Sequence, residues 1–239
     1  MLGFFYNRKS LLDSGLLHEA VDNHSHILYG LDDGVKKADE SLLILKFLET
    51  TGLKTIWFTP HTMEDVPNTT EGLQKRFEEL KAKYSGPLSF RLASEYMMDT
   101  LFMERLRNRD LLLHGQDRVL VETSTWSPPI DFWKILEDMM KAGYRPLLAH
   151  PERYRYMNEN DYMRLHKMGV VFQMNLPSIL GVYGEQVFDK ANFLLEKGWY
   201  SMVGSDCHRF RAIDSQYHSK ILKKETIKYI EPLMGGLED

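Results

Sequence analysis

Cysteine is almost absent from this sequence, with Cys207 the single one among 239 residues. One cysteine excludes an internal disulfide framework and any metal site built on a Cys-x-x-Cys pair, and it fits a reducing compartment. The chain also lacks a long run of Lys or Arg, and its formal net charge is −4. A dedicated nucleic-acid binder needs such positive charge to neutralise phosphates, so we expect no nucleic-acid partner and instead a small or protein-borne substrate.

Long apolar stretches are absent as well. No segment is long enough to span a bilayer, and residues 1–9 carry their charges after a short apolar stretch with no cleavage site following, which does not fit a signal peptide. We therefore expect a cytoplasmic protein. With 43% hydrophobic and 12% aromatic content, the chain can bury one full core. Residues 1–239 are expected to form a single domain, in which residues 1–19 are an N-terminal extension with a helix that packs its leucines, Leu11, Leu12, Leu16 and Leu17, on the domain.

Strand-like and helical segments alternate along nearly the whole chain, which predicts an α/β fold with a parallel sheet. The predicted strands are residues 20–27, 55–59, 89–93, 118–122, 146–149, 170–175 and 201–204. Amphipathic helical segments fall at residues 39–51, 71–84, 131–142 and 185–197. A glycine follows a helical pattern and precedes a strand at four places, as a C-terminal cap favours: Gly52, Gly143, Gly169 and Gly198.

Polar side chains recur at the C-terminal end of one predicted strand after another. They are His26, His61, Glu95, Glu122, His150, Asn175 and Asp206. An open doubly wound sheet brings together only the groups near its switch point, whereas a (β/α) barrel collects residues from all its strands at one face. The spread of these residues from the first strand to the last therefore favours a barrel with its site at that face.

Two short motifs, His24-Ser25-His26 and Asp206-Cys207-His208, each place two metal-ligand side chains two residues apart. On a strand such residues point to the same face. Imidazoles and carboxylates without thiolates suit Mn, Fe or Zn in a catalytic site. The candidates are too many for one tetrahedral ion, which predicts two or three divalent metals: His24, His26, Asp33, His61, Glu95, Glu122, His150, Asp206 and His208.

Over residues 20–215 the order of these motifs resembles the polymerase-and-histidinol-phosphatase (PHP) superfamily. The motifs are Asn23-His24-Ser25-His26, Leu31-Asp32-Asp33-Gly34, Thr59-Pro60-His61, Glu95, Glu122, His150-Pro151-Glu152-Arg153 and Ser205-Asp206-Cys207-His208. They are most similar to its bacterial protein tyrosine phosphatases, which are encoded with capsule and exopolysaccharide assembly proteins. The resemblance implies a distorted TIM-like barrel of about seven parallel strands, in which a metal-bound hydroxide hydrolyses phosphotyrosine.

The resemblance also implies ligand sets and a partner. One metal would be held by His24, His26, Glu95 and Asp206, and Glu95 would bridge to a second held by Glu122 and His150. A third would be held by Asp33, His61 and His208. Mn is the preferred ion, with Fe or Zn as alternatives. The implied substrate is a phosphotyrosine protein, the tyrosine-rich tail of a bacterial tyrosine autokinase.

Arginines are the candidates for binding phosphate. Arg153 follows the ligand motif at His150 and can offer a bidentate guanidinium contact. The family has a second arginine after its Asp-x-His motif, followed by prolines; here Arg209 and Arg211 are both candidates, and the proline tract is absent. Residues 175–184 also lack the arginine that the family places before an aromatic residue, which leaves the substrate preference open.

Several alternatives compete with these interpretations. Asp32 could replace Asp33 as a ligand, or accept from turn amides. Cys207 as a phosphatase nucleophile is disfavoured, because such a thiolate loop closes with an arginine where this chain has Ile213. Other candidate functions are a small-molecule phosphatase of the histidinol-phosphate type, another PHP metal-dependent hydrolase, and a metal-binding module without activity.

Overall fold

The computed structural model describes residues 8–237. Its strands form two sheets in which every pair is parallel. The smaller sheet has the order β1 (Val21–Asp22), β2 (Thr55–Phe58), β4 (Ser89–Leu92). The larger has the order β3 (His61–Thr62), β5 (Glu95–Met97), β6 (Arg118–Glu122), β7 (Arg145–Ala149), β8 (Val171–Asn175), β9 (Tyr200–Gly204). The predicted alternation and parallel pairing are confirmed.

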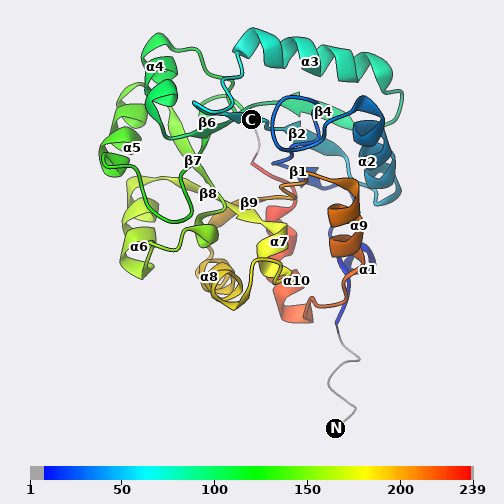
Figure 1. Cartoon of the computed structure of the whole chain (residues 1–239). Coiled ribbons are helices and arrows are strands. Elements are labelled where there is room, and N and C mark those ends of the chain that lie inside the picture. Colours follow the sequence, from blue (N-terminus) through cyan, green and yellow to red (C-terminus); the bar gives the residue numbers. More distant parts are fainter. Residues whose placement is uncertain (1–7, 238–239) are drawn as a thin grey trace.

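Helices surround the strands, which lie in the middle of the molecule (Figure 1). They are α1 (Leu11–Ser14), α2 (Ala38–Thr50), α3 (Thr70–Lys83), α4 (Thr100–Asn108), α5 (Phe132–Lys141), α6 (Glu159–Met168), α7 (Leu176–Ile179), α8 (Glu185–Glu196), α9 (Phe210–His218) and α10 (Lys224–Ile230), with 3₁₀ turns at Pro151–Arg153 and Glu231–Leu233. In α2 the buried face is Ile44, Leu45 and Leu48, the spacing of an amphipathic helix. None of the helices in residues 8–237 is long and apolar enough to cross a membrane.

Two of the predicted strands, residues 55–59 and 89–93, are each followed after a short break by a second short strand, and these breaks divide the sheet in two. Pro60 separates β2 from β3, and because proline has no N–H it cannot continue a hydrogen-bonded ladder. A similar break separates β4 from β5, which begins at Glu95. Each break shifts the following residues from the smaller sheet to the larger one. Closure of all the strands into one seven-stranded barrel stays a prediction.

The chain following β1 runs beside β9 and its C-terminal extension. Asn23 N donates to Val203 O at 3.1 Å, and His26 N donates to Cys207 O at 2.9 Å. A Cβ added to Gly204 would lie 2.3 Å from the Cβ of His24, so only glycine allows the two segments to approach so closely. The first and last strands of the chain are thus held together at the ends that carry the two ligand motifs.

A small apolar cluster covers one face of the larger sheet. It consists of Leu120, Leu147, Ala149, Val171 and Met202, all buried. Since alternate residues of a strand share a face, Leu120 lies on the same face of β6 as Glu122. Val171 likewise shares a face of β8 with two polar residues further along the strand. The cluster therefore forms an apolar floor beneath the polar groups.

The N-terminal extension is less helical than expected. Ser10 caps α1, and Gly15 ends it with a left-handed backbone (φ 83°), so the helix has four residues. Leu11, Leu16 and Leu17 are nevertheless buried, and α1 contacts α9. The predicted packing of the leucines on the domain therefore holds, while residues 1–7 lie outside the described part of the chain.

His114 predicts a dependence of stability on pH. Its ring stacks on Trp57 with centroids 3.9 Å apart, and burial, with Arg118 adding to it, lowers the pKa of His114 to about 3. In the unfolded chain a histidine has a pKa of about 6.5, so below this pH it binds a proton that His114 does not bind in the folded chain. The free energy of unfolding therefore falls as the pH falls from about 6.5 toward the pKa of the folded state. The comparison is made on chelator-treated protein. Between about pH 6.5 and 4.5, the free energy of unfolding of His114→Phe should fall by about 2 to 3 kcal/mol less than that of wild type. Urea unfolding at the two pH values measures this, and equal losses would contradict it.

Candidate metal centre

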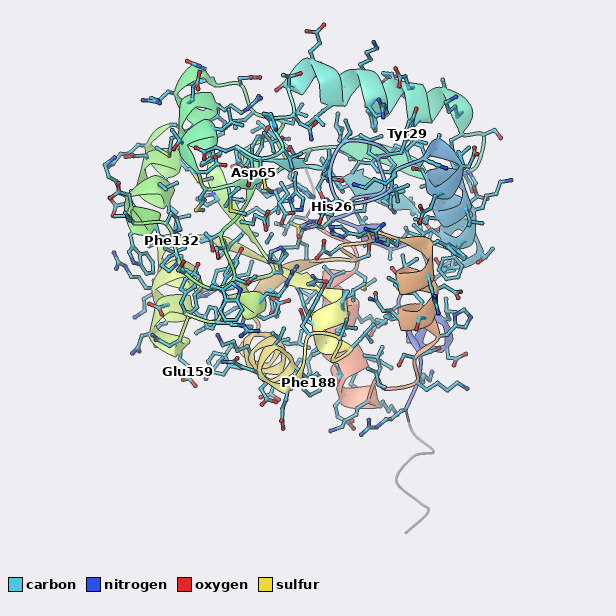
Figure 2. The ribbon with its side chains drawn as sticks, viewed as in Figure 1. His26, Tyr29, Asp65, Phe132, Glu159 and Phe188 are labelled. Atoms are coloured by element: carbon cyan, nitrogen blue, oxygen red, sulfur yellow. The ribbon has the colours of Figure 1, made fainter. Side chains whose placement is uncertain are left out.

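All nine predicted ligands converge at the C-terminal ends of the strands. His26, labelled in Figure 2, lies near the middle of the molecule inside the surrounding helices. Groups whose ligand atoms lie within 4.8 Å of one another are His26, Asp33, His61 and His208; His24, His26 and Asp206; and His61, Glu95 and Glu122. His150 joins through its Nε2, which lies 3.0 Å from Oε1 of Glu95. His26 and His61 each belong to two groups.

His24 and His26 turn their Nε2 atoms toward each other at 3.0 Å. Gln173 Nε2 donates to Asn23 O, which leaves Gln173 Oε1 to accept from His24 Nδ1 at 2.6 Å. His26 Nδ1 donates to Oδ2 of Asp32 at 2.7 Å. Because a neutral imidazole carries one N–H, both facing Nε2 atoms then hold lone pairs. Two lone pairs aimed at one point are what a cation requires.

Glu95 lies at the centre of the cluster. Its Oε2 lies 3.2 Å from His24 Nε2 and 3.3 Å from His26 Nε2. The same oxygen lies 3.1 Å from His61 Nδ1, and the residue is fully buried. Burial would raise the pKa of this carboxyl, but the nearby His24 and His61 hold it well below its usual range. Glu95 is thus an anion shared by several imidazoles.

Asp33, His61 and His208 form the open side of the cluster. The Asp33 side chain is 71% exposed, and its Oδ1 lies 3.3 Å from His208 Nε2 and 3.5 Å from His61 Nε2. His208 stacks on His26, with ring centroids 4.1 Å apart. Its Nδ1 donates to Asp206 O, so its Nε2 also faces the cluster with a lone pair. Of the three, Asp33 is the most exposed, so this side of the cluster faces solvent.

The donor set fits divalent metal ions. His61 Nδ1 lies 3.0 Å from Oε1 of Glu122, yet both atoms are buried without a hydrogen bond. Burial would lower the pKa values of His24 and His61, but Glu95 and neighbouring carboxylates outweigh it and raise them to about 9 and about 12. Without a metal ion a proton on these rings therefore balances the carboxylate charge, and a bound ion would replace that proton and use the lone pair of the nitrogen. The concentrated negative charge thus demands a balancing cation. Imidazole and carboxylate donors without thiolate suit Mn, Fe or Zn.

Two of the candidate ligands stand on left-handed backbone. His150 has φ 36° and Asp206 has φ 51°, a region that residues other than glycine seldom adopt. His150 directly follows the end of β7, and Asp206 lies just beyond the end of β9. The chain turns sharply at these points, and the turn brings each side chain back over the strand ends.

Asp32 supports the centre instead of replacing Asp33. Besides accepting from His26, its carboxylate accepts from His61 N at 3.0 Å and from Gly34 N at 2.9 Å. Asp32 is buried and Asp33 exposed. Asp32 therefore satisfies turn amides, one of the two roles considered for it, and it also fixes the tautomer of His26. The Oδ1 atom of Asp33 instead faces the Nε2 atoms of His61 and His208.

Gln173 orients His24, a role that the sequence analysis did not identify. It lies two residues before Asn175 on β8, and this spacing, which puts both on one face, was the available signal. Gln173→Leu keeps the approximate volume but removes the acceptor for His24 Nδ1. Loss of such a supporting contact typically costs 10- to 100-fold in metal affinity, and we expect about that in a competition titration with a fluorescent chelator. Wild-type affinity in this variant would contradict the tautomer argument.

Arg153 and Asn175 hold the outer oxygen of Asp206. Arg153 Nη1 donates to Oδ2 at 2.9 Å, and Asn175 Nδ2 donates to the same atom at 2.7 Å. The inner oxygen, Oδ1, lies 3.4 Å from His26 Nε2. Glu152 is fully buried and accepts from Asn175 N and from the Tyr200 hydroxyl. It therefore anchors the strand end that carries Asn175.

The other two predicted arginines differ in their relation to the site. Arg209 Nη2 donates to Asp33 O at 3.3 Å, which places its exposed side chain at the rim. Arg211 is exposed in the first turn of α9. Cys207 is buried with its Sγ 3.8 Å from Arg209 O, and burial raises the pKa of the thiol well above its usual range. A protonated buried thiol does not suit a nucleophile.

Several known proteins are similar to this chain in sequence and in fold. The chain is 28% identical to the tyrosine-protein phosphatase YwqE of Bacillus subtilis, over 86% of this chain and 84% of that one. It is 28% identical to the tyrosine-protein phosphatase CpsB of Streptococcus agalactiae, over 79% and 82% of the two chains. A crystal structure from work on YwqE of Bacillus subtilis and CpsB of Streptococcus pneumoniae, described as unique metal-dependent tyrosine phosphatases, superposes with a TM-score of 0.73 at 23% identity, covering 91% of this chain and 96% of that one.

More distant structures share the fold alone. The lactonase Lmo2620 from Listeria monocytogenes superposes with a TM-score of 0.52 at 11% identity, over 94% of this chain and 88% of that one. The family model for capsular polysaccharide synthesis, CpsB/CapC, matches residues 20–232, a span that contains all nine candidate ligands. The chain therefore belongs to the CpsB/CapC family of capsular polysaccharide synthesis.

Proposed function

We propose that this protein is a metal-dependent protein tyrosine phosphatase. The observation that carries the proposal is the convergence of lone-pair nitrogens and carboxylate oxygens around Glu95, which provides for cations beside an arginine that can bind phosphate. Membership of the CpsB/CapC family and the names of the two relatives as tyrosine-protein phosphatases support it. The strands would close into a distorted barrel, a view supported by the hydrogen bonds between the β1 and β9 segments.

The nine side chains would hold two or three ions, with Mn preferred and Fe or Zn as alternatives. His24, His26, Glu95 and Asp206 would hold one ion, and Glu95, Glu122 and His150 a second. Asp33, His61 and His208 would hold the third, with His26 close enough to share it. When bound, such ions neutralise phosphate charge and supply a water-derived nucleophile at neutral pH.

The chain's own residues supply orientation and charge. Arg153 is anchored on Asp206 through one nitrogen, so the remaining N–H groups of its guanidinium are available for a phosphate oxygen. Gln173 and Asp32 keep His24 and His26 in the tautomers that the site needs. A phenol has a pKa of about 10, so the departing tyrosine oxygen needs less protonation than an alkoxide would. Strong general acid catalysis is then dispensable.

The physiological substrate that we propose is the tyrosine-rich tail of a bacterial tyrosine autokinase in capsule or exopolysaccharide synthesis. The open side of the site at Asp33, with a 71% exposed side chain, admits a phosphotyrosine that extends from a protein surface. Arg209, exposed at the same rim, adds positive charge for a phosphorylated tail. Arg211 is the second candidate for this contact.

The first experiment is metal analysis by plasma mass spectrometry combined with turnover of a phosphotyrosine peptide. We expect two or three metals per chain, loss of turnover after chelation and its return with Mn²⁺. Chelation should also lower the melting temperature, because ions that bind the assembled ligands stabilise the folded state and not the unfolded chain.

The outcome also separates the alternatives. Faster hydrolysis of alkyl phosphates such as histidinol phosphate than of the peptide would favour a small-molecule phosphatase. Bound metals without turnover of any phosphate ester would defeat the phosphatase proposal and favour a binding module. Full activity in a metal-free protein would contradict the role given to the cluster.

A further inference from the structure

Tyr183 lies on a tight turn between α7 and α8, next to the metal centre. Gly181 and Gly184 flank this turn with φ of 72° and 88°, a left-handed backbone that glycine adopts without strain. Gly181 N donates to Ser178 O and Val182 N to Pro177 O, which ties the turn to α7. A large aromatic side chain on so short a turn is held in a defined place, and 39% of Tyr183 is nevertheless exposed.

The Tyr183 ring covers one face of the Arg153 guanidinium. The Cζ atom of Arg153 lies 4.6 Å from the ring centroid, within the range of a cation–π contact. Burial raises the pKa of Tyr183 to about 12, and the charge of Asp206 adds to this effect, which indicates that the ring lies close to that carboxylate. Tyr183 is thus in contact with the side chain that our proposed function assigns to phosphate binding.

We propose that Tyr183 determines substrate specificity by packing against the aryl ring of a bound phosphate ester. A phosphate is bound by the N–H edge of a guanidinium, while Tyr183 covers a face, so the group esterified to that phosphate must pass beside the Tyr183 ring. An aromatic ring there gains an offset or edge-to-face contact that an alkyl group cannot make. The residue before Tyr183 is Val182, which has no polar group to bind phosphate, so the ring of Tyr183 is the recognition element of the turn. This inference rests on the proposed function for the position of the phosphate.

Phenylphosphonate and methylphosphonate provide the test, since both carry the phosphoryl charge and neither has a leaving group. Their affinities for the metal-loaded protein are measured by isothermal titration calorimetry. We expect wild type to prefer phenylphosphonate and Tyr183→Leu to reduce that preference roughly three- to tenfold, the usual worth of an aromatic pair. Tyr183→Phe, which keeps the ring, should retain the preference.

Tyr229→Leu serves as the matched control, because Tyr229 is 50% exposed on α10 and should leave both affinities unchanged. Equal losses for the two phosphonates in Tyr183→Leu would mean that the ring only holds Arg153, and would overturn the proposal. Unchanged affinities, or a wild type without any preference for phenylphosphonate, would overturn it as well. Turnover of the phosphotyrosine peptide is measured separately, so a protein that discriminates the phosphonates but hydrolyses nothing would defeat the phosphatase proposal alone.

Discussion

Replacement of Glu95 by glutamine is expected to reduce kcat/KM for a phosphotyrosine peptide by about 1000-fold or more. The substitution keeps size and shape but removes the negative charge that His24, His26 and His61 share. One amide oxygen cannot bridge two cations as a carboxylate does, and the amide N–H₂ would face imidazole nitrogens that should hold lone pairs. We therefore expect the variant to contain fewer metals per chain.

Metal analysis and steady-state kinetics on the same preparation test this expectation. Glu78→Gln is the control, since Glu78 is an exposed residue of α3 with a side chain that is 65% exposed, and should behave as wild type. Circular dichroism establishes that both variants are folded. A Glu95→Gln protein with the wild-type number of metals and undiminished turnover would show that the cluster is not organised around this carboxylate.

Replacement of Arg153 by lysine is expected to lower kcat/KM about 100-fold while the metal content stays unchanged. Arg153 donates to Asp206 at 2.9 Å, stacks on Tyr183 and still has N–H groups to offer. An ammonium is a point charge without a planar fork, so lysine can pair with Asp206 or contact phosphate but cannot do both in the same geometry.

Arg155→Lys is the matched control. Arg155 also stacks on an aromatic ring, with its Cζ 3.9 Å from the centroid of Trp126, but within residues 8–237 it makes no hydrogen bond or ion pair with a candidate ligand. Assays with phenyl phosphate avoid any contribution from a longer peptide. If the two lysine variants lost activity equally, the loss would come from the general positive field and not from a phosphate contact of Arg153.

The convergence of the candidate ligands was predictable because most of them lie at or just beyond the end of a predicted strand, and the ends of parallel strands meet at one edge. The division of the candidate ligands into groups that could each hold a metal ion was less predictable. That His26 and His61 each belong to two groups depends on ring orientation, which sequence spacing does not determine. The contact of Gln173 with His24 joins residues 149 positions apart and depends on the register of non-neighbouring strands. The division into two sheets follows from breaks near Pro60 and Ala93, of which only the proline is a visible signal.

The junction of the first and last strands has a consequence for when the site can form. Asp22 accepts from the amide and the hydroxyl of Ser205, 183 residues further along the chain, and places His24 and His26 beside Asp206. During synthesis, the chain emerges from its N-terminus, so the leading histidine pair waits until Ser205 and Asp206 have been made, 183 residues after Asp22 in the case of Ser205. A nascent chain therefore offers metal ions only a partial set of ligands. High-affinity loading of the proposed metal centre would then be a late event that coincides with completion of the fold.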